Sequence, residues 1–132
     1  TFAGSPVSCR VGSAVLDVIE AEGLQERARR VGGRLEEGLR ELAERHPVVG
    51  DVRGLGLFLG VELVRDPEER LPAADRASYV VERLLDQRIL VSTDGPEHNV
   101  LKIKPPLAFG PEDADCMVHE LDVVLGEDPV RL

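Results

Sequence analysis

Residues Asn99 to Phe109, N-V-L-K-I-K-P-P-L-A-F, predict a short strand that carries two cations and then stops. Apolar residues alternate there with Lys102 and Lys104, and because strand side chains alternate between two faces, both lysines should share one face. Pro105 and Pro106 cannot donate ladder hydrogen bonds, so the strand should end before them. The lysine pair is either an anion site or protection for an exposed strand edge, where lysines are common.

Four amphipathic segments around this strand predict helices. The first follows Ser5-Pro6, which has the form of an N-cap with proline at the first helical position. The second follows Gly23 and ends at His46-Pro47, and its charged residues should form a solvated face. The expected helices span residues 6–21, 24–45, 74–87 and 111–125.

Three further predictions concern the strands and the fold class. Residues 48–64 are rich in β-forming residues and should form a strand, with a bulge or tight bend at its glycines. Residues 89–91 should form a short strand, antiparallel to residues 100–103 across the turn at Asp94-Gly95-Pro96. The resulting order predicts an α+β fold, with a small, mainly antiparallel sheet covered on one face by helices.

Composition limits the partners that the chain can have. Its 132 residues suffice for one domain, and a net charge of −9 disfavours binding to nucleic acid. No apolar run is long enough to cross a membrane. The chain begins without methionine and reads as a fragment of a longer protein. We therefore expect no nucleic-acid partner and no membrane anchor.

The residues alone supply no complete active site. The three histidines are far apart and have no metal-ligand spacing. Cys9 and Cys116 are expected to be buried free thiols in a reducing cytosol. Arg53 could contact a ligand, but an arginine beside a turn more often pairs with a neighbouring carboxylate or caps a helix end. The two lysines are the one suspicious feature of an otherwise ordinary α+β domain.

Three segments in order, however, resemble the C-terminal part of class III aminotransferases, which are fold-type I enzymes that use pyridoxal phosphate. The opening T-F-A-G-S-P resembles a T-F-G-G-N-P segment of that family, D-V-R-G-L-G-L resembles its V-R-G-x-G-L strand, and L-K-I-K-P-P-L resembles its R-x-x-P-P-L strand. The resemblance spans essentially the whole chain. It implies a helical region at residues 6–45 that links to a small domain at residues 48–127.

The resemblance also implies roles for four residues. Thr1 matches a threonine that hydrogen-bonds the cofactor phosphate, usually in the neighbouring subunit of a dimer, and Gly4 fits a close turn beside that phosphate. Lys102 matches an arginine that clamps the substrate carboxylate, and lysine cannot form the same planar fork. The string N-V-L-K-I-K-P-P resembles the phospholyase branch, whose substrates include phosphoethanolamine, so Lys102 and Lys104 are candidate contacts to substrate phosphate.

This resemblance leaves three readings open. The first is a cytoplasmic, homodimeric phospholyase that eliminates phosphate and ammonia from a phosphorylated amine. The second is an ω-amino-acid:keto-acid aminotransferase. The third is a non-enzymatic module for anion binding or dimerisation. Because the family's Schiff-base lysine lies upstream of the matched segments, the chain alone should be inactive and should not bind the cofactor tightly.

Overall fold

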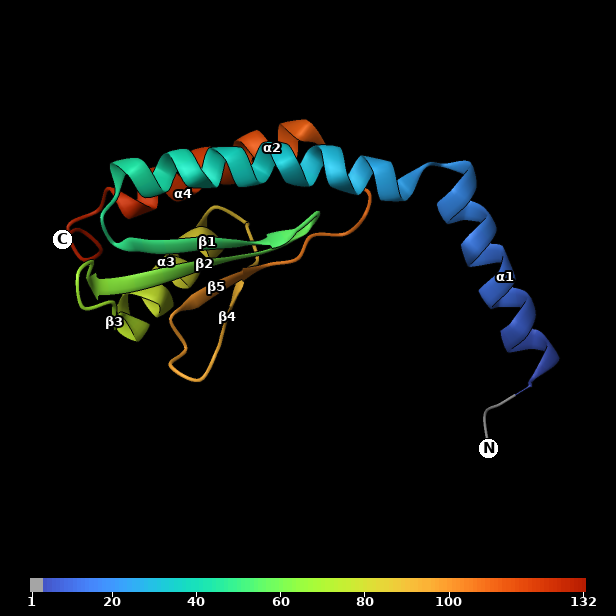
Figure 1. Ribbon diagram of the computed structural model, residues 1–132, viewed down its shortest axis with the longest axis horizontal. Helices are drawn as coiled ribbons and strands as arrows, with labels where there is room; N and C mark the ends of the chain where they lie inside the picture. Colours follow the sequence, from blue (N-terminus) through green and yellow to red (C-terminus); the bar gives the residue numbers. More distant parts are fainter. Residues whose placement is uncertain (1–3) are drawn as a thin grey trace.

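The computed structural model describes residues 4–132, which form four helices and five strands (Figure 1). All four helices begin and end within one residue of their expected bounds. In chain order the elements are α1 (Pro6–Ala21), α2 (Leu24–Arg45), β1 (Val49–Leu55), β2 (Phe58–Asp66), β3 (Leu71–Pro72), α3 (Ala74–Asp86), β4 (Ser92–Asp94), β5 (Val100–Ile103) and α4 (Pro111–Leu125).

The strands form one antiparallel sheet in the order β1-β2-β5-β4, and the short β3 pairs with β2. Burial alternates along β2, where Leu59, Val61 and Leu63 are buried and the residues between them are partly exposed. This period-two pattern gives the sheet one apolar face and one polar face. The predicted α+β fold with a helix-covered antiparallel sheet is therefore confirmed.

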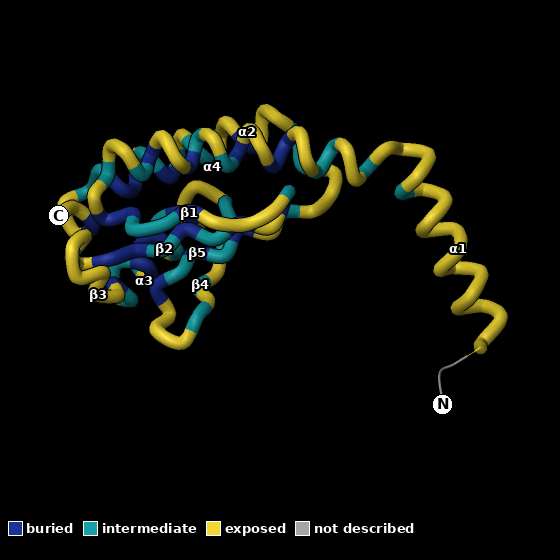
Figure 2. The backbone as a smooth tube through the Cα atoms, viewed as in Figure 1, coloured by how far each residue is buried: buried dark blue, intermediate teal, exposed yellow. Residues whose placement is uncertain are grey.

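Helices α2, α3 and α4 cover the apolar face of the sheet (Figure 2). The buried stripe of α2 includes Val31, Leu35 and Leu42, as the spacing predicts, and also Leu39. Met117 of α4 is buried in the same cluster. This core cluster lies between the three helices and one side of the sheet, and within residues 4–132 these helices leave the other side uncovered.

Helix α1 does not join this core. It extends away from the sheet (Figure 1) and contains no buried residue. Its apolar stripe, predicted from helical spacing, is exposed: Val7, Val11 and Val15 are 74%, 59% and 52% accessible. The helix prediction is thus confirmed, but within residues 4–132 no part of the core covers the apolar stripe of α1.

Two strand predictions need correction. Residues 48–64 form a hairpin of two strands rather than one bent strand, because Gly54 and Gly56 adopt φ values of 150° and 56° and reverse the chain. The strand predicted at residues 89–91 lies instead at Ser92–Asp94, where β4 pairs with β5. The antiparallel pairing itself is confirmed.

The cysteine prediction is half right. Cys9 and Cys116 are free thiols within helices, but both are exposed. Cys9 is exposed because α1 packs on no core, and Cys116 lies between the buried stripe positions Ala114 and Met117 on the solvent side of α4. Within residues 4–132, none of the helices combines the length and apolar character needed to cross a bilayer.

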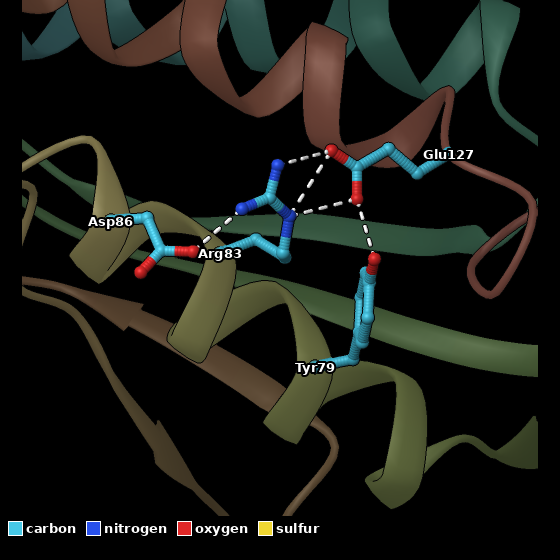
Figure 3. Close-up of polar contacts among 4 residues, drawn as sticks. All are labelled: Tyr79, Arg83, Asp86 and Glu127. Carbon is cyan, nitrogen blue, oxygen red and sulfur yellow. Dashed lines mark hydrogen bonds and ion pairs between the residues drawn. The ribbon is translucent and has the colours of Figure 1, made fainter.

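A polar cluster joins α3 to the end of α4 (Figure 3). The Arg83 guanidinium donates from Nε and Nη2 to the Glu127 carboxylate, at 3.0 and 2.9 Å, and from Nη1 to Asp86 at 2.6 Å. The Tyr79 hydroxyl donates to the same Glu127 carboxylate at 2.6 Å. These bonds to Arg83 and Tyr79 lower the pKa of Glu127 to about 2. The cluster ties the last helix to the third.

Candidate functional site

The uncovered face of the sheet carries a groove of about 470 Å³. Its walls come from the β1–β2 hairpin on one side and from β4 and β5 on the other. The residues that matter for its chemistry are Arg53, Leu55, Phe58, Gly60, Asp94 and Lys102. The groove therefore combines apolar walls with charged side chains, as ligand sites commonly do.

Strand register aligns the two cations of the groove across a glycine. In the antiparallel ladders, Arg53 of β1 pairs with Gly60 of β2, and Gly60 pairs with Lys102 of β5. Residues paired in this way point to the same face of the sheet. The groove therefore has a cation on each side of a floor position that has no side chain.

Lys102 forms an ion pair with Asp94 at the edge of this groove. The distance from Lys102 Nζ to Asp94 Oδ2 is 3.0 Å, and the lysine side chain is 36% accessible. The hydrogen bond from Lys102, together with that from the backbone N–H of Gly95, lowers the pKa of Asp94. Lys102 is thus held in place by a carboxylate and still exposed to a ligand.

Arg53 is paired as the sequence predicts. Its Nη1 lies 2.6 Å from both Asp51 Oδ2 and Glu62 Oε2. Hydrogen bonds to these two carboxylates raise the pKa of Arg53, so the guanidinium stays charged. Two partners on one nitrogen fix the side chain at the wall of the groove.

Lys104 takes a different position from Lys102. It lies just beyond β5, and its Nζ is 5.7 Å from the ring centre of Phe58, a cation–π contact. Since Phe58 also lines the groove, both lysines lie on the outer side of the sheet, as their alternation predicts. The structure brings Lys102 into the groove and leaves Lys104 at its margin.

The two candidate cofactor contacts lie apart from the groove. Thr1 falls outside the described residues. Gly4 has φ +80°, and a Cβ built there would meet nothing within 4 Å. It precedes α1, which projects away from the sheet (Figure 1). The described structure therefore does not bring Gly4 and Lys102 together.

Sequence reasoning missed three groove residues. Asp94 was expected only as a turn former, Gly60 only as a possible bend, and Phe58 had no expected role. The available signal was the strand register, since pairing of β2 with β5 places Gly60 opposite Lys102. That register depends on the hairpin, which a single-strand interpretation of residues 48–64 conceals.

Comparison with known proteins identifies relatives of the whole arrangement. A phospholyase from Arthrobacter, solved in complex with phosphoethanolamine, superposes with a TM-score of 0.90 and 38% identity, covering 96% of this chain and 30% of that one. An amine transaminase from an uncultivated Pseudomonas species, in its PLP-bound form, gives a TM-score of 0.83 and 37% identity, covering 94% of this chain and 28% of that one.

A curated relative from Drosophila melanogaster is named alanine–glyoxylate aminotransferase 2-like. It is 49% identical over 116 residues, which are 87% of this chain and 24% of that protein. The chain thus spans about a quarter of the length of that relative. The model of the family "Aminotransferase class-III" matches residues 1–125. With this match over nearly its whole length, the chain belongs to the class III aminotransferase family.

Proposed function

We propose that this chain is the C-terminal part of a pyridoxal-phosphate enzyme that eliminates phosphate and ammonia from a phosphorylated amine. The observation that carries the proposal is Lys102, exposed in a groove on the free face of the sheet. Similarity to a phospholyase solved with phosphoethanolamine supports the same reading. In the net reaction, phosphoethanolamine and water give acetaldehyde, ammonia and phosphate.

The chemistry of lysine favours this substrate class. Arginine grips a carboxylate with two parallel N–H donors, whereas lysine presents a compact point charge. Phosphoethanolamine has no carboxylate, so its binding does not require the carboxylate clamp that an arginine at position 102 would provide. Lys102 would instead attract the phosphate, and Lys104, 5.7 Å from the ring centre of Phe58, would add to the positive field at the margin.

The described residues fit part of a cofactor site but not a complete one. The chain has two lysines, and one is ion-paired with Asp94 while the other lies over Phe58. We propose that Thr1 and Gly4 contact the cofactor phosphate, because a hydroxyl donates well to phosphate oxygens and the open, positive-φ Gly4 permits close approach. When bound, pyridoxal phosphate withdraws electrons from the substrate carbon that bears nitrogen.

The same proposal covers the organisation of the protein. Residues 48–127 would be the small domain of a longer enzyme, and residues 6–45 would link it to the preceding part. Helix α1, whose apolar side chains are exposed here, would pack within the complete protein. We further propose that this protein is a cytoplasmic homodimer.

A second candidate is an ω-amino-acid:keto-acid aminotransferase. The 49% identity to a relative named as an aminotransferase favours it. The two reactions differ in one requirement. An aminotransferase needs a keto acid to accept the amino group, whereas a phospholyase releases phosphate without one.

The test is an assay of the complete gene product with pyridoxal phosphate and phosphoethanolamine but no keto acid. Equal release of inorganic phosphate and acetaldehyde is the expected result. Activity that appears only after pyruvate is added would replace the proposal with the aminotransferase reading. A protein that is silent under both conditions would favour a non-enzymatic anion-binding or dimerisation module.

A further inference from the structure

Gly60 is the starting point, because the fold does not explain it. It lies inside β2, and its φ is not in the left-handed region that favours glycine. A Cβ built there would meet Val100 Cγ1 at 3.1 Å and Arg53 O at 3.9 Å, so alanine would fit with a small shift. Glycine weakens a strand, and a strand glycine often marks close approach by a ligand. Glycine at position 60 therefore lowers the stability of the strand, although the backbone conformation there does not require glycine.

The charges around Gly60 indicate what could approach it. Arg53 and Lys102 are paired with Gly60 from either side, so their Cα atoms lie two strand spacings apart, about 10 Å. Both side chains are long enough to lean toward a group above the glycine. Within residues 4–132, the ion pairs of Arg53 use Nη1 only, which leaves Nε and Nη2 available as donors.

The neighbouring carboxylates do not fill this floor. Asp51, Glu62 and Asp94 lie two residue pairs further along the strands, in the next row on the same face, which also contains Val100. They hold the two cations at the walls by ion pairs, and Gly60 is partly exposed between those cations. Because the three carboxylates repel an anion, a bound anion has to lie closer to the two cations than to the carboxylates. A phosphate monoester, with nearly two negative charges at pH 7, gains more from two cations than a carboxylate does.

We propose that Arg53 and Lys102 jointly bind a phosphate group seated on the bare backbone of Gly60. Gly60 is then a specificity-determining residue, and Arg53 is a second anion-binding residue beside Lys102. The inference rests on the proposed function and deepens it. It names the ligand class as a phosphate monoester dianion and assigns the group two contacts in addition to Lys102.

The test measures binding of inorganic phosphate to the complete holoenzyme by calorimetry, with acetate as the monoanion control. Gly60→Ala and Arg53→Gln are each expected to weaken phosphate binding at least tenfold. Gly33→Ala is the matched control, because a Cβ at Gly33 would meet nothing within 4 Å and the residue lies on α2. This control should bind phosphate like the parent. Thermal melting of each variant verifies that it folds. If Gly60→Ala does not fold, the phosphate affinity of Arg53→Gln decides the test.

The outcomes separate this inference from the proposed function. Unchanged phosphate affinity in a folded Gly60→Ala and in Arg53→Gln would overturn the inference, as would a parent enzyme that binds acetate as tightly as phosphate. The parent enzyme could release no phosphate from phosphoethanolamine while the two variants still lose phosphate affinity as predicted. That result would support the phosphate-binding site and refute the lyase activity. The Michaelis constant for phosphoethanolamine should rise in both variants when the lyase activity is present.

Discussion

The two faces of the sheet differ in what their residues contribute, even between neighbours in the chain. Leu101 points into the core and has 0% accessibility, while the next residue, Lys102, points into the groove. The inner face is apolar and covered by three helices, and the outer face carries paired charges beside an open floor. Alternate positions of one strand therefore serve stability on one face and, in the proposed function, ligand binding on the other. Substitutions on the inner face should therefore lower the free energy of unfolding, whereas substitutions on the outer face should mainly weaken phosphate binding.

The largest loss of stability is expected on the inner face. Leu101→Ala would leave a cavity beneath the helices and should lower the free energy of unfolding by about 2–5 kcal/mol. Urea denaturation followed by circular dichroism measures this change. Val123→Ala on α4 is the control, since Val123 is 52% accessible and its loss should cost less than about 0.5 kcal/mol. Equal losses in the two variants would contradict the assignment of the core.

A pair of adjacent glycines sharpens the comparison at the edge of the core. A Cβ on Gly32 would clash with the carbonyl oxygen of Gly56, at the tip of the β1–β2 hairpin. Gly32→Ala should therefore cost about 1–3 kcal/mol, because backbone must move. Gly33→Ala, in open space on the same helix, should stabilise the fold by about 0.5–1 kcal/mol. Thermal melting should show a lower melting temperature for Gly32→Ala and a higher one for Gly33→Ala. Changes of the same sign would refute the close contact between Gly32 and Gly56.

A smaller, pH-dependent loss of stability is expected when the contact between α3 and the end of α4 is changed. Bonds from Arg83 and Tyr79 hold the pKa of Glu127 at about 2, below its ordinary value of 4.5. The ionised carboxylate therefore stabilises the folded state, fully above pH 4.5 and decreasingly as the pH falls toward 2. Glu127→Gln should destabilise the protein at pH 7, and the difference from the parent should shrink as the pH approaches 2. Glu69→Gln, in an exposed loop, is the control and should change the free energy of unfolding at pH 7 by less than about 0.5 kcal/mol.

The smallest effect on stability is expected on the outer face. Lys102→Ala removes an exposed ion pair and should change the free energy of unfolding by less than about 1 kcal/mol. The same variant should weaken phosphate binding at least tenfold in the complete enzyme. Denaturation and calorimetry on one preparation measure both quantities. A large loss of stability would show that Lys102 supports the fold instead of the site.

Much of this architecture can be predicted from the sequence, because apolar spacing and helix punctuation are local signals. The four helices follow from periodicity and from the prolines and glycines at their ends. The strand at Val100–Ile103 follows from alternation. Arg53 was correctly expected to pair with a nearby carboxylate. Each of these depends on residues that lie close together in the chain.

The remaining features depend on contacts between distant residues. The position of β4 is set by its register with β5, which places Ser92 opposite Lys102 although residues 89–91 have the stronger β propensity. Burial of Cys9 was wrongly predicted, since spacing shows that α1 has an apolar side but not what covers it. The role that we propose for Gly60 can be inferred only when the three strands are aligned.

The most direct test of the central claim is Lys102→Arg in the complete enzyme. The measured quantity is the ratio of two kcat/KM values, one for phosphate release from phosphoethanolamine without a keto acid and one for amino transfer from 4-aminobutyrate to pyruvate. Arginine restores a planar carboxylate clamp, so the ratio should fall at least tenfold while thermal stability stays unchanged. An unchanged ratio in a stable variant would contradict the claim that the outer face of the sheet selects phosphate through Lys102.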